Sequence, residues 1–192
     1  MYRVTMDVIG VTPIVFSKYL DKSKGAEAAP KKGENDKSPE YEKRISYLKA
    51  HVDDKGIMYI PACAIADCIC AMARKVGDKK KGNATWARTF DTGIEAEDNM
   101  SLGVHINKSE RHEGFFRVSK DTDSRIFKSF PMIRNWKTTA HLIIEDDSIP
   151  FDKVKEYAEL AGRRIGLGSF RKQNKGMMGK FVIKNFKVTN IE

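Results

Sequence analysis

The chain begins with a regular alternation of apolar and polar residues. Within residues 2–9, the side chains of Tyr2, Val4, Met6 and Val8 occupy every second position. Successive side chains of a strand point to opposite faces, so this pattern predicts a strand with one buried face. Short runs rich in β-branched and aromatic residues predict further strands at 57–60, 127–133, 138–144 and 180–188.

A strongly apolar helix is predicted at 61–76. Pro61 suits the first turn of a helix, where a missing N–H costs nothing, and Gly77 marks the end of the helix. The apolar residues that recur at helical spacing are Ile65, Ile69, Met72 and Val76. Alanines between them permit close packing, so we expect this helix to lie against a sheet.

Two further helices are predicted from the same period. One starts at Asp152, whose carboxylate suits an N-cap, after a turn at 145–150. Its inward stripe consists of Val154, Tyr157, Ala158 and Ala161. The other is a short helix over 40–51, with Tyr41, Ile45 and Leu48 on one side.

Two insertions interrupt this pattern. From Ser17 to about Pro39 the chain has almost no large apolar side chain, and such a stretch cannot offset the entropy cost of its own ordering. With the short helix, this first insertion covers about 17–50. The stretch 78–115 lacks a sustained hydrophobic period and is predicted as a second insertion.

Without its insertions, the chain reads strand, helix, strands, helix, strand. This order predicts a single α+β domain over 1–192, with a ferredoxin-like or RNA-recognition-motif antiparallel sheet and two helices on one face. The other face of such a sheet, with its loops, commonly takes single-stranded nucleic acid.

Charge and composition narrow the class of partner. The formal net charge is +9, from 35 basic against 26 acidic residues, which favours an anionic partner and nucleic acid first. A membrane is the competing anionic surface. No apolar run approaches the roughly 20 residues that span a bilayer, and no leader-like segment opens the chain, so we expect a cytoplasmic protein.

The cysteines and histidines predict neither a metal site nor a cofactor. Cys63, Cys68 and Cys70 crowd into one predicted helix, where they cannot jointly hold a tetrahedral metal, and we expect buried, reduced thiols. His105 and His112 stand seven apart among charges, a spacing that is commonplace in loops. No metal and no cofactor are therefore expected.

The segment 161–180 is the most informative part of the chain, since five glycines and six basic residues share its twenty positions. Glycine lets backbone N–H groups approach an anion closely, and basic side chains neutralise phosphates. Gly166 and Gly168 are candidate approach points, and Phe170 is a candidate for stacking on a base. The candidate phosphate contacts are Arg163, Arg164, Arg171, Lys172, Lys175 and Lys180. The alternative is a helix C-cap followed by an ordinary solvated hairpin.

Residues 162–171, Gly-Arg-Arg-Ile-Gly-Leu-Gly-Ser-Phe-Arg, resemble the C-terminal glycine-rich loop of the RAMP superfamily, the repeat-associated proteins of CRISPR effector complexes. The stretch 52–73, with Asp-Lys-Gly-Ile-Met-Tyr-Ile-Pro before a helix, is similar to the corresponding stretch of backbone subunits in that family. After Pro61, residues 62–67 replace the Gly-Ser-Ser-Leu-Lys-Gly that the family usually carries.

The resemblance implies binding of single-stranded guide RNA on the sheet face and the glycine-rich loop. It further implies an antiviral defence complex, with other subunits or copies of the same chain as partners. The two insertions would lie where family members carry thumb-like or partner-contacting segments. A mobile-element or viral relative of such a complex fits equally well.

Two other functions remain open. Some RAMP proteins cut RNA without metal, and the candidates here are His51, Asp36, Asp53 and Asp54 as a general base. Lys43 or Arg44 would stabilise the phosphate. An Asp in a turn is more often a capping residue, however, and a His at a helix end is more often solvated. The third function is an adaptor or inhibitor that binds other proteins through its insertions.

Trp86 to Arg88 and Phe115 to Arg117 are secondary candidates for stacking on bases.

Overall fold

The computed structural model describes residues 1–20, 30, 32–33, 37–80, 84–117 and 123–191. Asp36 and parts of both predicted insertions lie outside these residues. Within the described part, no helix is long and apolar enough to cross a membrane.

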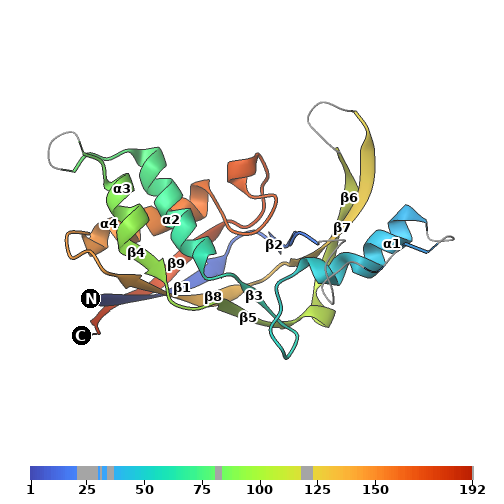
Figure 1. Ribbon diagram of the computed structural model, residues 1–192, viewed down its shortest axis with the longest axis horizontal. Coiled ribbons are helices and arrows are strands. Elements are labelled where there is room, and N and C mark those ends of the chain that lie inside the picture. The colour runs from blue at the N-terminus through green and yellow to red at the C-terminus, as the bar shows by residue number, and fades with distance from the viewer. Residues whose placement is uncertain (21–29, 31, 34–36, 81–83, 118–122, 192) are drawn as a thin grey trace.

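A four-stranded antiparallel sheet forms the centre of the protein (Figure 1). Helices α2 (Cys63–Val76) and α4 (Phe151–Arg164) alternate with its strands along the chain in the order β1, α2, β4, β8, α4, β9. This order and pairing are those of a ferredoxin-like fold, which confirms the predicted fold class. The strands lie side by side as β4 (Ile94–Ala96), β8 (Lys137–Ile144), β1 (Tyr2–Gly10) and β9 (Phe181–Asn190).

Alternation along the strands separates the two faces of the sheet. Val4, Met6 and Val8 are fully buried, as the sequence predicts, and Ala140 and Leu142 of β8 join them under the helices. The inward stripe of α4 is also confirmed, since Val154, Tyr157, Ala158 and Ala161 are fully buried. The start of α4 differs from the prediction: Pro150 is the N-cap, and Asp152 lies one residue inside the helix.

The opposite face of the sheet is mostly polar, although Ile9 and Val182 are exposed on it. The Thr5 hydroxyl lies 3.1 Å from Nδ1 of His141, and Asp7 accepts hydrogen bonds from Thr139 at 3.2 Å and Asn185 at 2.7 Å. None of the described residues that alternate onto this face is Phe, Tyr or Trp. Aromatic rings are what the RNA-recognition motif uses to stack bases, so this face lacks the feature that the fold analogy requires.

An arm extends from the sheet on the right of Figure 1. Its hairpin pairs β6 (Glu110–Arg117) with β7 (Arg125–Ile133), and β2 (Ile14–Val15) pairs with the inner end of β7. The helix α1 (Ser38–Ile45) and the 3₁₀ turn η2 (Ser46–Lys49) pack against β7. The helix predicted at 40–51 thus exists, although its second half is a 3₁₀ turn.

The stretch 78–115 contains more regular structure than the sequence predicts. It holds β4, which is part of the main sheet, so only a portion of it is inserted into the ferredoxin-like order. A three-residue strand is too short to show a period, which explains why the pattern missed it. The remaining elements are α3 (Trp86–Gly93), β5 (Met100–His105), which pairs with β3 (Ile57–Ile60), η3 (Ile106–Lys108) and β6.

A buried cluster of charges joins α1 to the arm. The Glu42 carboxylate accepts hydrogen bonds from Lys49 and Lys128, each at 2.6 Å, and Lys49 also donates to the Ser129 carbonyl at 2.8 Å. The side chains of Glu42 and Lys49 are each 8% exposed. The Lys49 ammonium lies 4.7 Å from the ring centroid of Phe130. This cluster fixes the helix on the hairpin with charges removed from water.

Burial disfavours the charged forms of both Glu42 and Lys49. For Glu42, the ion pairs decide the direction in which its pKa shifts. Burial alone raises the pKa of the Glu42 carboxyl, but hydrogen bonds and positive charge from Lys128 and Lys49 outweigh it and hold the pKa below its usual value. Burial lowers the pKa of the Lys49 ammonium, and Glu42 offsets this only in part.

Replacing Glu42 tests this cluster. We expect Glu42→Gln to lower the free energy of unfolding by about 3–5 kcal/mol at neutral pH, because a buried lysine loses its counterion. A lowered carboxyl pKa contributes stability above the unfolded value of 4.5, and this contribution is lost as the pH falls through the folded pKa. The difference between wild type and variant in urea denaturation should therefore shrink below pH 4.5.

The matched control is Glu110→Gln, which breaks the 2.7 Å pair with Arg134. Both side chains of that pair are about half exposed, so its loss should cost about 0–1 kcal/mol. Equal losses in the two variants would contradict a special role of the Glu42 cluster.

Candidate nucleic-acid interface

The last turn of α4 presents two arginines to solvent. Arg163 and Arg164 are exposed residues at the end of the helix, where positive charge is favourable because the helix dipole is negative there. The alternative interpretation of this segment in the sequence is a helix C-cap at Gly162. In the structure, Gly162 instead lies inside the helix. A Cβ at Gly162 would stand 2.2 Å from the Phe181 carbonyl oxygen, so glycine lets α4 pack directly on β9.

The loop after α4 uses its glycines for contacts with its own chain. Gly166 donates its N–H to the Ala161 carbonyl at 3.0 Å, and Leu167 donates to the Gly179 carbonyl at 2.9 Å. A Cβ at Gly168 would stand 2.7 Å from the Val15 carbonyl oxygen. These glycines close the loop, and the N–H of the buried Gly166 is hydrogen-bonded within the chain.

The exposed lysines of the segment lie on the outer side of this loop. Lys172 begins the 3₁₀ turn η4 (Lys172–Asn174), and Lys175 follows it with a φ of +62°. Both are exposed, whereas Lys180 is half-buried and donates its N–H to the Thr12 hydroxyl at 2.9 Å. Of the three lysines that the sequence predicts as phosphate contacts, two thus lie on the surface and one lies at the base of β9.

Phe170 connects the loop to the arm. Its ring centroid lies 5.1 Å from that of Phe116, 5.3 Å from Phe130 and 5.2 Å from His112, all on the hairpin. Phe170 is half-buried and has a φ of +55°. The ring is therefore part of an aromatic cluster, and only its remaining exposed part is available to a base.

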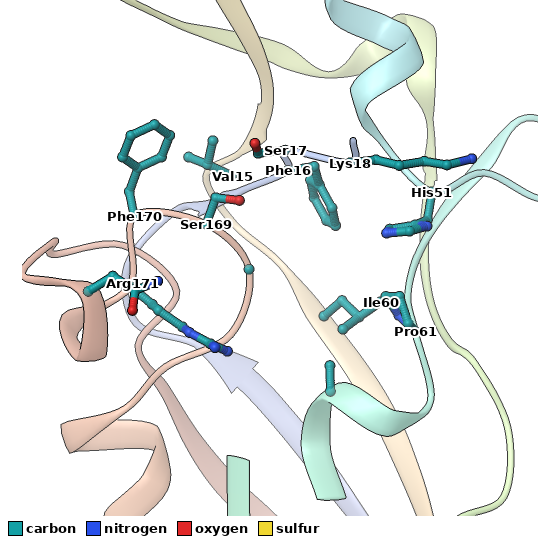
Figure 2. A pocket seen from close by; sticks show the side chains of 13 residues that line it. Val15, Phe16, Ser17, Lys18, His51, Ile60, Pro61, Ser169, Phe170 and Arg171 are labelled. Atoms are coloured by element: carbon teal, nitrogen blue, oxygen red, sulfur yellow. The ribbon is translucent and has the colours of Figure 1, made fainter. Parts of the chain in front are cut away.

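A pocket of about 500 Å³ opens beside the loop. Three distant parts of the chain form its walls: the residues after β1, the start of α2 with the strand before it, and the glycine-rich loop. Figure 2 shows Arg171 on one side of the pocket and His51, Ile60 and Pro61 on the other. The lining residues are Val15, Phe16, Ser17, Lys18, His51, Ile60, Pro61, Ala64, Gly168, Ser169, Phe170, Arg171 and Asn174.

The described lining residues of the pocket include basic side chains and no acidic ones. Lys18, His51 and Arg171 line it, and no Asp or Glu is among the described lining residues. Nε of Arg171 is buried and has no hydrogen-bond partner among the described atoms. Pro61 and Ala64 bring the amino end of α2 to the same wall, where the helix dipole is positive. The arrangement suits an anion.

The cysteines of α2 do not add chemistry to this pocket. Cys68 and Cys70 are buried free thiols, as predicted, whereas Cys63 is exposed, contrary to the prediction, because it starts the helix on the solvent side. Burial raises the pKa of Cys68 to about 12 and that of Cys70 to about 11. Both thiols are therefore neutral at physiological pH, unsuited to nucleophilic attack.

The catalytic candidates separate into two groups. His51 lies in the pocket wall, with its ring 5.7 Å from that of Tyr59. Asp53 instead caps a turn, since its carboxylate accepts the N–H groups of Lys55 at 2.9 Å and Ile57 at 2.8 Å. Asp54 is exposed, and Asp36 lies outside the described residues. Lys43 and Arg44 belong to α1, away from the pocket wall: Lys43 pairs with Glu113 at 3.5 Å, and Arg44 lies over the Tyr41 ring.

Sequence reasoning missed Lys18, Ser17 and the pocket itself. Lys18 stands in the stretch predicted as a mobile insertion, yet its N–H donates to the Lys49 carbonyl at 2.8 Å, which fixes the backbone there. No local pattern marks a site whose walls come from three segments, so the sequence held no signal for it.

Comparison with known proteins supports the fold. No family model matches the chain, and no curated protein matches it in sequence. The cryo-EM structure of the Type III-B Cmr-beta bound to cognate target RNA contains a chain that aligns with a TM-score of 0.54 and 10% identity over 98% of this chain. This chain spans 61% of that chain's length. At this identity, the similarity shows a shared fold alone. The crystal structure of Cmr6 from Pyrococcus furiosus aligns over 95% of this chain and 98% of that chain, with a TM-score of 0.49 and 12% identity.

Alanine at Gly179 should disrupt the loop. Its φ is +71°, and an added Cβ would stand 1.8 Å from the Leu167 carbonyl oxygen. We expect Gly179→Ala to destabilise the protein by well over about 1 kcal/mol in urea denaturation, because backbone strain and a clash add together. The control is Gly77→Ala, whose φ is +66° but whose Cβ would meet nothing within 4 Å. If both variants lose the same stability, the close approach of the two backbone segments is not important.

Proposed function

We propose that this chain binds single-stranded RNA through the glycine-rich loop and the adjoining pocket, as a subunit of a CRISPR-type ribonucleoprotein. The observation that carries the proposal is a pocket lined by Lys18, His51 and Arg171 without an acidic residue among its described walls. Phosphate contacts supply most of the affinity of such binding.

The surroundings of the pocket extend this positive surface. Arg163, Arg164, Lys172 and Lys175 are exposed on the end of α4 and on the loop that forms one wall. Residues 161–192 carry eight basic residues and a single acidic one, so the positive charge of the chain is concentrated here. A strand of RNA that follows the loop would meet several cations in succession.

The open face of the sheet is the weaker of the two predicted binding surfaces. It lacks stacking rings among its described residues, and Thr139 and Asn185 both donate hydrogen bonds to Asp7. Lys184 and Lys187 are nonetheless exposed there. We therefore assign the RNA to the loop and use the sheet face as a comparison surface.

The shared fold supports the larger assembly. A chain of the same fold occurs in the Type III-B Cmr-beta, a complex whose structure was determined with its cognate target RNA. The arm, which projects from the ferredoxin-like part with its own hairpin and helix, offers a surface for neighbouring subunits (Figure 1). We propose other subunits, or copies of this chain, as its partners.

Charge reversal separates the two surfaces. We expect the double variant Arg163→Glu, Arg164→Glu to weaken binding of a labelled single-stranded RNA in fluorescence anisotropy. The slope of log affinity against log salt should decrease in magnitude by about 0.7 for each lost phosphate contact. The matched control, Lys184→Glu with Lys187→Glu, makes the same charge change on the sheet face and should reduce affinity less.

Three outcomes are decisive. A larger loss in the sheet-face variant would move the RNA to that face. Unchanged affinity and slope in both variants would remove the two arginines from the interface. Purified chain that ignores added single strands at low salt would exclude RNA binding and leave the protein-binding adaptor as the better function.

Metal-independent RNA cleavage is the second candidate, and one observation favours it. His51 and Arg171 line the same pocket, and an imidazole with a guanidinium can together accept the 2′-hydroxyl proton and stabilise the developing phosphate charge. Asp53 is occupied by its turn, so His51 is the better base among the described candidates.

His51→Ala tests this activity. If the pocket cleaves RNA, the variant should lose about 100-fold or more of the cleavage rate in the presence of EDTA, measured at saturating protein so that a change in RNA affinity does not enter the rate. Cleavage by wild type and its loss in the variant are read on a denaturing gel, with Asp54→Ala as a control outside the pocket. Cleavage that persists in the His51 variant excludes this residue as the base.

A further inference from the structure

The pocket is larger than a phosphate group requires. Its volume of about 500 Å³ falls in the range of roughly 300–1,000 Å³ that is typical of small-molecule sites. An anion site built from exposed cations alone would need no such hollow. The extra space lies beside apolar and neutral polar side chains. It therefore suits a ligand that has uncharged groups in addition to a charged one.

We infer that the pocket holds one complete ribonucleotide, with its phosphate against Arg171 and its base against the wall formed by His51 and Pro61. This inference rests on the proposed function, because the nucleotide would belong to the bound RNA strand. It specifies that one base leaves the strand and enters the protein, whereas the proposed function requires only phosphate contacts.

The side of the pocket that Arg171 forms suits the phosphate. In Figure 2 the Arg171 side chain extends from the loop toward the start of α2. Arg171 is half-buried and lines the pocket, so the part of its guanidinium that faces the pocket can donate to a phosphate oxygen. The amino end of α2, at Ala64, adds its dipole to the same wall.

The opposite wall suits a base. Ile60 and Pro61 present apolar surface, and the His51 imidazole lies next to them in Figure 2. A planar base packs on such a surface through its faces, and the imidazole ring can stack on it. Neutral hydrogen-bonding groups of Ser17, Ser169 and Asn174 line the same space and can meet the base edge or the ribose.

Backbone hydrogen bonds hold the walls in place. Phe16 donates its N–H to the Pro131 carbonyl at 3.0 Å, and Ser169 donates to the Val15 carbonyl at 2.8 Å. On the far wall, Tyr59 donates to the His51 carbonyl at 3.0 Å. Each wall is thus attached to a strand of the fold, so the pocket is formed before a ligand arrives, and ordering costs little on binding.

Calorimetric titration of the full chain tests this inference directly. The probes are the four ribonucleoside 5′-monophosphates, the matching nucleosides and inorganic phosphate. We expect at least one monophosphate to bind about tenfold or more tightly than both its nucleoside and inorganic phosphate, a difference of about 1.4 kcal/mol. A monophosphate that binds no better than inorganic phosphate would overturn the inference, because it would reduce the pocket to an anion site.

Two variants locate the binding. Arg171→Gln removes the guanidinium, and Ala64→Leu narrows the pocket without changing charge. Each should reduce monophosphate affinity by about tenfold or more. The control is Lys184→Gln, which makes the same charge change as Arg171→Gln at an exposed residue of the sheet face, outside the pocket lining. Monophosphate affinity should be unchanged in this control. Equal losses in Arg171→Gln and Lys184→Gln would place the nucleotide elsewhere.

The same preparations distinguish this inference from the proposed function. Single-stranded RNA that binds with full affinity to Ala64→Leu, together with no monophosphate binding to wild type, would refute the nucleotide pocket and keep the RNA-binding function. Monophosphate binding without RNA binding would refute the proposed function and keep a nucleotide pocket. Thermal denaturation confirms that each variant is folded.

Discussion

The backbone of Val15 is where the main parts of this protein meet. Val15 pairs with Met132 of the arm, and its carbonyl oxygen accepts a hydrogen bond from the N–H of Ser169 in the glycine-rich loop. The same carbonyl would stand 2.7 Å from a Cβ at Gly168. No side chain fits between loop and strand at this point, so the position of one pocket wall depends on glycine at 168. The contact of that wall with the arm, which Phe170 makes, depends on the same glycine.

The sequence predicts the ferredoxin-like core well because its period is long enough to read. The alternation at Val4, Met6 and Val8 and the stripe at Val154, Tyr157 and Ala158 are both confirmed as buried. The strand β4 escaped prediction because three residues cannot show a period, and Asp152 resembles an N-cap without being one since Pro150 occupies that place. Larger errors are α3, β5 and β6, which form within or from the stretch 78–115 although no sustained period marks them, because contacts with distant parts of the chain decide their structure.

The candidate site was only partly accessible to sequence reasoning. Its charge was visible, because basic residues cluster after Ala161, and so was its loop. The roles of the glycines were not predictable, because a sequence does not distinguish a glycine that approaches a ligand from one that approaches its own chain. His51 and Lys18 join Arg171 only through the fold, and no spacing along the chain predicts that they line one pocket.

The arm has a small core of its own, formed by Val15, Phe130 and Met132 and separate from the main core of the sheet and helices. Side chains of the outer hairpin pack on this minor core, on α1 and on one another, as the rings of Phe115 and Phe127 do at 5.6 Å. Substitutions or length changes there leave the packing between sheet and helices untouched. The glycine-rich loop is the exception, because Phe170 packs on Phe116 and Phe130, so a change in those rings would be transmitted from the arm to the wall of the pocket.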